Sequence, residues 1–194
     1  HLSIRRQRQM CIRDRFNSLN TIANLIVVDP AIAETMTLRL SSVFRHVLTN
    51  ASRPLTTIGE EIEFIRSYLS IEEIRFSDRL KVVITLPEIL EHEPIPSLIL
   101  QPLVENALKH GLARKPGPAN LWISVESTAD QIRIILEDDG LGPDSSPDES
   151  SSGLGMKNVS QRLATHYQDS AGIRLESRIG GGSRVTLWLP REPS

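Results

Sequence analysis

The stretch LQPLVENALKH, residues Leu100–His110, predicts a helix with two chemically different sides. At about 100° per residue, its apolar side chains fall on one side and its polar side chains on the other. The polar side carries Glu105, Asn106, Lys109 and His110. Such a face could hold a hydrated Mg²⁺ and the phosphates that it bridges, because Mg²⁺ takes oxygen ligands and keeps several waters. The alternative is the ordinary solvated face of an amphipathic helix.

The stretch LEDDGLG, residues Leu136–Gly142, follows an apolar run that predicts a strand. A carboxylate that leaves a buried strand, here Asp138, can accept a hydrogen bond from an exocyclic amine such as that of adenine. Gly140 and Gly142 would let the backbone come close to a ligand. The alternative is a strand-ending turn in which Asp139 and Gly140 are merely favourable turn residues.

The stretch SGLGMKN, residues Ser152–Asn158, places Gly153 and Gly155 before a helix predicted for Met156–Tyr167. Backbone N–H groups at a helix start, together with the positive end of the helix dipole, suit phosphate oxygens. Lys157 adds positive charge nearby. The alternative is a flexible entry into the helix without a ligand.

Outward from these stretches, runs rich in Val, Ile and Leu predict strands at Leu80–Leu86, Leu121–Glu126, Ile132–Glu137, Ile173–Ser177 and Arg184–Leu189. The last two are joined by a hairpin turn, GGGSRV, at Gly180–Val185. With the helices at Ser97–His110 and Met156–Tyr167, they predict an α/β sandwich, a helix layer on a mixed sheet. We expect a polar connection at Pro87–Pro96 and a mobile loop at Leu141–Ser152, where Gly, Pro, Ser and Asp dominate.

The N-terminal part of the chain predicts a helical hairpin. Apolar residues recur at three and four over Phe16–Asn50, with a restart at Asp29-Pro30 because proline suits a first helical turn. Thr57 and Glu60 form a candidate capping box for a second helix that runs to about Phe76. We therefore divide the chain into a hairpin at 16–77 and an α/β domain at 78–194. The exposed apolar stripe of such a hairpin predicts a homodimer through a four-helix bundle.

Composition excludes some classes of function. The 194 residues carry a formal charge of −2 and a sequence pI near 6.2, so no global field favours nucleic acid. A single cysteine, Cys11, favours a reducing, cytoplasmic compartment. The apolar runs are shorter than the roughly 20 residues that cross a bilayer. Because the chain begins with His1, we interpret it as a fragment whose upstream sensor region could include a membrane anchor.

The order and spacing of these stretches resemble the nucleotide-binding boxes of the GHKL ATPases, and more sharply the LytS-like sensor histidine kinases. The resemblance rests on FNSLN at 16–20, YLSIEEIRFSDRL at 68–80, IPSLILQPLVENALKHG at 95–111 and GLGMKNVSQRL at 153–163. It covers residues 16–190, nearly the whole chain. Asp139 stands where many relatives have Asn, and Met156 where many have Leu.

The resemblance implies roles for individual residues. Asn106 would ligate Mg²⁺, Glu105 would orient or deprotonate groups at the phosphate, and Lys109 and His110 would assist there. Asp138 would accept the adenine amine of ATP. Gly140 and Gly142 would shape the adenine pocket. The lid over the phosphates would include Gly153, Leu154, Gly155, Lys157 and Asn158. Gly182 and Ser183 would form the far wall.

The resemblance also implies an activity, the Mg²⁺-dependent transfer of the γ-phosphoryl group of ATP to a histidine and then to the receiver domain of a response regulator. Two alternatives stay open. One is an ATP-binding regulatory or scaffold module without phosphotransfer, and the other is a dimeric interaction protein without a ligand.

One departure from the family pattern bears directly on that activity. The phosphate-accepting histidine of the family precedes FNSLN, and Arg13 occupies its position. A guanidinium stays protonated and offers no nucleophilic lone pair, so autophosphorylation at this position is not expected. His46 falls well downstream and is interpreted as a packed or solvated helix histidine. We hypothesise that residues 1–15, HLSIRRQRQMCIRDR, are foreign sequence; a genuine degenerate kinase is the competing interpretation.

Overall fold

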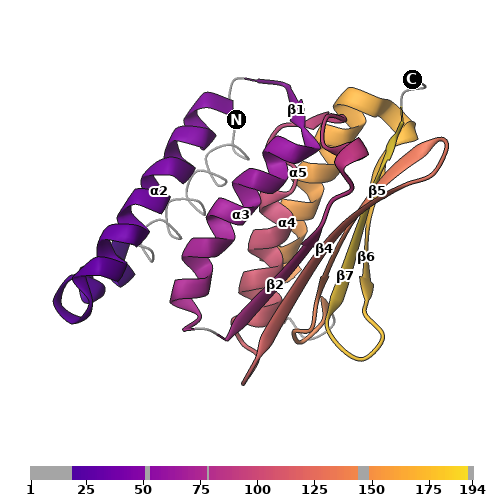
Figure 1. The fold of residues 1–194 in the computed structure, drawn as a ribbon. Helices are drawn as coiled ribbons and strands as arrows, with labels where there is room; N and C mark the ends of the chain where they lie inside the picture. The colour runs from indigo at the N-terminus through magenta and orange to yellow at the C-terminus, as the bar shows by residue number, and fades with distance from the viewer. Residues whose placement is uncertain (1–18, 51–52, 78, 144–148, 192–194) are drawn as a thin grey trace.

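The computed structural model describes residues 19–50, 53–77, 79–143 and 149–191, with the side chains of 46–50 and 149–154 excepted. A layer of helices covers one face of a mixed sheet (Figure 1). The sheet has the order β2-β4-β5-β7-β6, in which β2 runs parallel to β4 and the other neighbours are antiparallel. The predicted α/β sandwich with a mixed sheet is confirmed.

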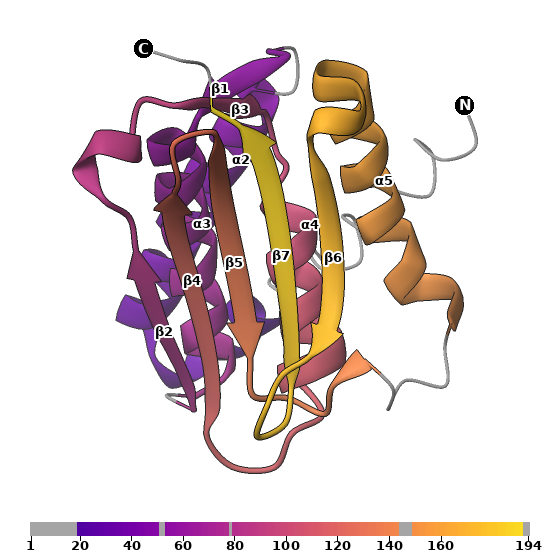
Figure 2. The same ribbon diagram turned by 90° about the vertical axis from the view of Figure 1, so that its right-hand side faces the viewer.

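The strands of this sheet lie close to their predicted positions. Their bounds are β2 Leu80–Thr85, β4 Ala119–Ser127, β5 Gln131–Asp138, β6 Gly172–Ser177 and β7 Ser183–Pro190. Along β4, β5 and β7, buried and more exposed residues alternate, because successive side chains of a strand point to opposite faces. Figure 2 shows the face that the helices leave uncovered.

The predicted restart of the N-terminal helix is confirmed. Residues 19–28 are helical, Asp29 is not, and α2 begins directly afterwards at Pro30–Asn50. The Asp29 carboxylate accepts a hydrogen bond from the Ile32 N–H, at 3.1 Å, in the manner of an N-cap. A short side chain and a proline therefore set the start of α2.

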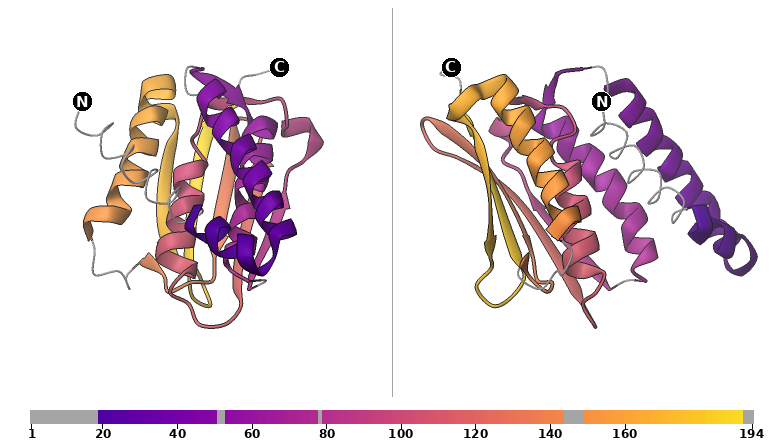
Figure 3. Two further views of the ribbon diagram at one scale, coloured as in Figure 1. Left: turned by 90° about the vertical axis from the view of Figure 1, so that its left-hand side faces the viewer. Right: turned by 180° about the vertical axis from the view of Figure 1, so that it is seen from behind.

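Helix α3, Ile58–Arg75, begins at the capping box expected from the sequence. The Glu60 N–H donates to Thr57 Oγ1 and the Thr57 N–H donates to Glu60 Oε2, each at 3.2 Å. Helix α2 packs along α3, where Arg39 Nη1 donates to the Ser70 carbonyl at 3.0 Å. Figure 3 shows α2 as the outermost layer, on the side of α3 away from the sheet.

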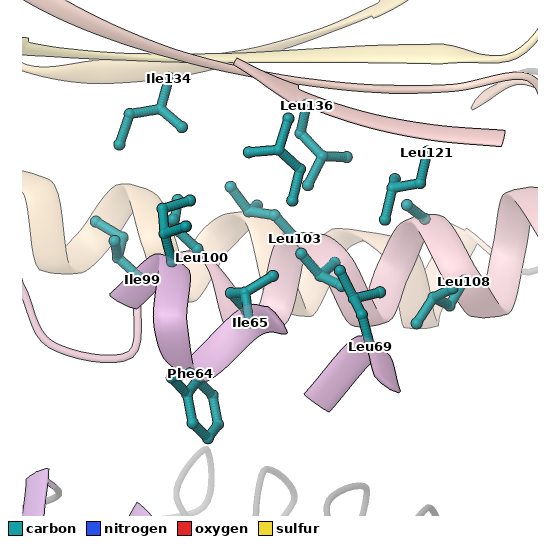
Figure 4. Packing of buried hydrophobic residues seen from close by; sticks show 14 of the residues in the cluster. Phe64, Ile65, Leu69, Ile99, Leu100, Leu103, Leu108, Leu121, Ile134 and Leu136 are labelled. Atoms are coloured by element: carbon teal, nitrogen blue, oxygen red, sulfur yellow. The ribbon is translucent and has the colours of Figure 1, made fainter. Parts of the chain in front are cut away.

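Helix α3 is buried on two sides. Ile65 and Leu69 point toward α4 and the sheet, whereas Phe64 points the opposite way (Figure 4). All three belong to a single buried cluster that also includes Leu103 of α4 and Leu136 of β5. The second helix of the predicted hairpin is therefore packed into the core of the α/β layers as well as against α2. The division at residues 77/78 stays a prediction.

Several local expectations were wrong. The connection Pro87–Pro96 contains a 3₁₀ turn, η1 Glu88–Leu90, and a short strand, β3 Pro94–Pro96, which pairs antiparallel with β1 Leu55–Thr57. The helix predicted from Ser97 begins later, as α4 Gln101–Asn106, and continues as a π-helical segment, η2 Ala107–Leu112.

The predicted loop at 141–152 ends earlier than expected, because α5 spans Glu149–Tyr167. A 3₁₀ turn, η4 Gln168–Ser170, leads from α5 into β6. Residues 144–148 lie outside the described residues, so the predicted mobility of that loop stays a prediction. So do the expectations for Arg13 and for residues 1–15, and the side chain of His46 is likewise not described. Among the described residues, no helix is both long and apolar enough to span a membrane.

Candidate functional site

Asp138, the last residue of β5, is a buried carboxylate with 2% of its surface exposed. The Gly140 N–H donates to its Oδ1 at 2.8 Å, and Ser183 donates through both its backbone N–H and its hydroxyl. Burial raises the pKa of Asp138 above its ordinary value, these hydrogen bonds oppose the rise, and the neighbouring Asp139 adds to it. A carboxylate in this position is a strong acceptor for a donor that reaches it.

Glycines let three chain segments meet around Asp138. A Cβ at Gly140 would lie 2.4 to 2.5 Å from backbone atoms of Gly111, and one at Gly111 would lie 2.6 Å from Asp138 Oδ1. Gly182 has a φ of +94°, and a Cβ at this position would collide with the backbone carbonyl of Asp138. The contact therefore requires glycine at these positions. Gly140 and Gly182 are among the site residues predicted from sequence, whereas Gly111, which directly follows the polar helix face, is not.

A pocket opens beside Asp138 between the helix layer and the sheet. About 590 Å³ of empty space, part of it open solvent, lies within its outline. Its polar side chains include Asp138, Asn106, His110 and Ser183. The other lining residues are mostly apolar, namely Leu103, Ala107, Gly111, Leu136, Gly142, Pro143, Met156, Leu175 and Val185. A flat apolar ligand with a few polar groups at its edge suits this lining.

The structure separates the four polar residues of the LQPLVENALKH helix. Asn106 and His110 line the pocket, whereas Glu105 and Lys109 are half-buried and do not line it. Gln101 Nε2 donates to Glu105 Oε1 at 2.8 Å, one turn back on α4. The roles expected for Glu105 and Lys109 at the phosphate stay predictions.

Asn106 is closely packed by the helix that faces it. A Cβ at Gly155 would lie 2.6 Å from Asn106 Nδ2 and 3.3 Å from its Oδ1. Glycine at 155 therefore allows α5 to approach the carboxamide of α4. Among the described residues, no group of three or more His, Cys, Asp or Glu side chains could hold a metal ion.

The glycines of SGLGMKN do not precede a helix, which corrects the sequence interpretation. Helix α5 already begins at Glu149, so Gly153 and Gly155 lie inside it. Their N–H groups are therefore not at a helix start, where they would be free to bind an anion. Met156 lines the pocket, Lys157 is exposed, and Asn158 is half-buried without lining it. The side chain of Leu154 lies outside the described residues.

Asp139, next to Asp138, makes different contacts. Its carboxylate forms an ion pair with Lys115 Nζ at 2.6 Å and accepts from the backbone and the side chain of Asn120, at 2.8 and 2.6 Å. Burial pushes the pKa of Asp139 upward, but Lys115 and Asn120 outweigh it and the pKa is lowered. Asp139 therefore fastens β5 to β4 and to the segment before it.

The chain belongs to the family of histidine kinase-, DNA gyrase B- and HSP90-like ATPases, which residues 91–193 match. Residues 15–80 match the histidine kinase family. The chain is 37% identical over 176 residues to the sensor histidine kinase BtsS of Escherichia coli (strain K12), covering 90% of this chain and 31% of BtsS. It is 32% identical over 190 residues to the sensor histidine kinase/phosphatase LytS of Staphylococcus aureus (strain MRSA252), covering 91% of this chain and 32% of LytS. The chain thus spans about a third of the length of these curated relatives, and the resemblance to LytS-like sensor histidine kinases is confirmed.

Solved structures with the same fold are also histidine kinases. The nucleotide-free catalytic domain of histidine kinase ThkA matches with a TM-score of 0.53 and 14% identity, covering 72% of this chain and 99% of that domain. The histidine kinase domain of the blue-light activated kinase of Erythrobacter litoralis EL346 matches with a TM-score of 0.50 and 20% identity, covering 89% and 87%. ThkA in complex with the response regulator protein TrrA matches with a TM-score of 0.50 and 16% identity, covering 97% and 62%.

Proposed function

We propose that this chain is the ATP-binding catalytic part of a sensor histidine kinase and that its pocket binds the adenine of Mg-ATP. The observation that carries the proposal is Asp138, a buried carboxylate that faces an otherwise largely apolar pocket also lined by Asn106. A buried carboxylate is costly unless donors surround it, and Asp138 already accepts from Gly140 and Ser183. A ligand amine would add one further donor from the side of the pocket.

Adenine suits the pocket in shape and in chemistry. Its exocyclic amine would donate to Asp138, whose neighbours Gly140 and Ser183 hold the carboxylate in place by donating to it. Its flat ring would lie against apolar walls such as Leu136 and Val185. Removing this ring from water supplies affinity, and the single amine contact supplies specificity.

The phosphates would extend toward α4 and α5. Mg²⁺, when bound, would neutralise charge on the phosphates, and Asn106 would offer it one carboxamide oxygen. The close packing of Gly155 on Asn106 supports this assignment, because it holds the carboxamide still. His110 would meet the phosphates from the pocket wall, while Glu105, Lys109 and Lys157 would have to turn inward to reach them. Gly142, which lines the pocket, would shape the space for adenine. The nucleotide contacts expected of Gly153, Leu154 and Asn158 stay predictions.

The proposed reaction is phosphoryl transfer to a histidine. A neutral imidazole nitrogen attacks the γ-phosphorus of ATP, the bond to the bridging oxygen breaks, and ADP leaves. The phosphoryl group would pass next to an aspartate of a response regulator, and the complex of the similar kinase ThkA with TrrA supports that class of partner. The protein's contribution to such a transfer is positioning and neutralisation of charge.

We propose that the chain dimerises through the exposed face of its outermost helices, residues 19–28 and α2. Val27 and Val28, just before α2, are 86% and 81% exposed, and Ile26, Ile32 and Leu38 are exposed as well. Apolar side chains that gather on neighbouring helical turns indicate an interaction surface. A second copy of the chain could cover them in a four-helix arrangement.

One observation favours a second candidate function, an ATP-binding scaffold without phosphotransfer. Arg13 stands at the position that the family uses for the phosphate-accepting histidine. A chain with arginine there would bind nucleotide and retain its partners without accepting phosphate.

The Arg13→His variant tests the kinase proposal against this alternative. Incubation with γ-labelled ATP and Mg²⁺ is expected to give acid-labile label on Arg13→His and none on the unchanged chain, because only the imidazole is a nucleophile. Arg13→Lys is the matched control and should stay unlabelled. An unlabelled Arg13→His protein that still binds ATP would favour the scaffold.

A further inference from the structure

The segment that leads into α4 is capped from another part of the chain. Leu100, at the N-cap of α4, supplies no side-chain hydrogen bond, and Pro102 in the first turn has no N–H to satisfy. The N–H groups of the residues just before the helix need acceptors as well, and Glu61 of α3 provides one. Its carboxylate accepts from the N–H groups of Leu98, Ile99 and Leu100 at 2.5, 3.2 and 3.3 Å.

The local alternative to this cap is present and unused. Ser97 is buried, and its hydroxyl has no hydrogen-bond partner within the part of the chain that the structure describes. Serine is among the preferred capping residues, and its use would bury no charge. Leu98 instead adopts a φ of +56°, a conformation that costs energy for a leucine. The backbone before α4 is therefore held in a costly conformation in which three consecutive N–H groups reach one distant carboxylate.

Arg162 of α5, a third helix, also takes part in this contact. We call the contact formed by Glu61, Arg162 and the backbone of residues 97–100 the joint. Glu61 is 0% exposed, and burial raises the pKa of its carboxyl group, which the three N–H groups and the charge of Arg162 oppose. Arg162 of α5 also donates through Nη1 to the Ser97 carbonyl. The side chains of Glu61 and Arg162 thus tie α3, α4 and α5 together at one point.

Two of the helices that meet at the joint, α4 and α5, also form one wall of the pocket. Asn106 is five residues after Gln101, about 8 Å along the axis of α4 at 1.5 Å per residue. Gly155 and Met156, which meet Asn106 and the pocket, are about two turns from Arg162 on α5. A shift of α4 relative to α5 at the joint would therefore move Asn106 against its packing partner.

We propose that Glu61 is a positioning residue through which the helical segment sets the affinity of the pocket for nucleotide. Glu61 lies in the part of the chain that matches the histidine kinase family, 15–80, and the helices that it fastens lie in the ATPase part, 91–193. A displacement of α3 is thereby transmitted to Asn106. This inference rests on the proposed binding of Mg-ATP.

The test compares Glu61→Gln with two controls on the whole chain. Gln keeps the shape and one acceptor oxygen but removes the charge that Arg162 faces. Glu63→Gln makes the same chemical change at an exposed position on α3. Ile132→Ala removes a buried side chain on β5, near the end of the sheet remote from Asp138, and is the control for a loss of stability. Ile132 takes no part in the hydrogen bonds of Glu61 and Arg162 described above. Thermal unfolding and titration with Mg-ATP, far below the melting temperature, are measured for each.

We expect Glu61→Gln to weaken Mg-ATP binding about 10-fold, within the range usual for coupling between two sites. Glu63→Gln should bind like the unchanged chain, and Ile132→Ala should melt earlier with an unchanged Kd. A merely structural cap predicts a Glu61→Gln protein that melts earlier but binds with the unchanged Kd, and this result overturns the inference. An unchanged chain that binds no Mg-ATP overturns the proposed function first and the inference with it.

Hydrogen exchange on the unchanged chain gives a second readout that needs no variant. Coupling is reciprocal, so a nucleotide that depends on the joint must also stabilise it. Saturating Mg-ATP is expected to slow exchange of the Leu98, Ile99 and Leu100 amides at least fivefold. The Thr128 N–H donates to the Gln131 carbonyl in the turn between β4 and β5, at the end of the sheet remote from Asp138. This amide should exchange at an unchanged rate. Equal rates at Leu98–Leu100 with and without bound nucleotide would overturn the inference even if Glu61→Gln failed to fold.

Discussion

Two buried carboxylates, Glu61 and Asp138, lie in different surroundings. Both accept hydrogen bonds from backbone N–H groups, and burial raises the pKa of both. The charged group that acts on Glu61 is a cation, Arg162, whereas the one that acts on Asp138 is another carboxylate, Asp139. Glu61 is enclosed by protein, and Asp138 faces a pocket. Burial alone therefore does not mark a binding residue; what marks it is a buried charge that a ligand can still reach.

The largest effect on stability is expected from Glu61→Ala. It leaves the three N–H groups of Leu98–Leu100, in the segment that leads into α4, without their acceptor and Arg162 without its counter-charge. Together these should lower the free energy of unfolding by about 3 kcal/mol or more. Urea unfolding followed by circular dichroism measures the loss. A loss below about 1 kcal/mol would contradict the view that Glu61 is a structural carboxylate, in contrast to Asp138, which faces the pocket.

A smaller, pH-dependent effect is expected from Asp138→Asn in the absence of nucleotide. The pKa of Asp138 is raised by burial from an unfolded value of about 3.9, so the folded state holds the proton more tightly. Its contribution to stability is therefore full below about pH 4 and falls as the pH rises through the raised folded pKa. Asn has no such titration.

Melting temperatures between pH 4 and 8 check this expectation. The difference between the unchanged chain and Asp138→Asn should decline as the pH rises and become constant above the folded pKa of Asp138. Two curves that stay parallel over this range would mean that the carboxylate is not destabilised by burial.

The smallest effect is expected from Asp139→Asn. The pKa of Asp139 is lowered, so its ion pair with Lys115 stabilises the fold above about pH 4 and the stabilisation is lost as the pH falls through the lowered folded pKa. Because the pair is only partly buried, the loss at pH 7 should be about 1 kcal/mol or less. The affinity for Mg-ATP should be unchanged. Weaker binding would place Asp139 in the site as well.

The fold was predictable where the spacing of apolar residues repeats over enough of the chain. The strands β4, β5 and β7 and the helix α3, with its Thr57 and Glu60 capping box, follow directly from spacing and local chemistry. The β1–β3 pair was missed because each strand has three residues, too few to show alternation. The early start of α5 was missed because serines and glycines at 149–155 have low helix propensity.

The site was predictable where one residue carries the chemistry at the end of an element. Asp138 and Asn106 were placed in one site from sequence, and the structure brings both to one pocket. The separation of Glu105 and Lys109 from that pocket depends on how α4 is rotated, which the tertiary packing decides. The contact between Glu61 and the start of α4 spans 37 to 39 residues of sequence, and no local pattern indicates it.

Titration of the unchanged chain and of Asp138→Asn with ATP at fixed Mg²⁺ tests the central assignment most directly. The unchanged chain should bind, and Asp138→Asn should lose about 2 kcal/mol of binding free energy, about 30-fold in Kd, because the adenine amine would meet a weaker acceptor or a second amine. Equal affinity in the two proteins would contradict the assignment of Asp138 to adenine.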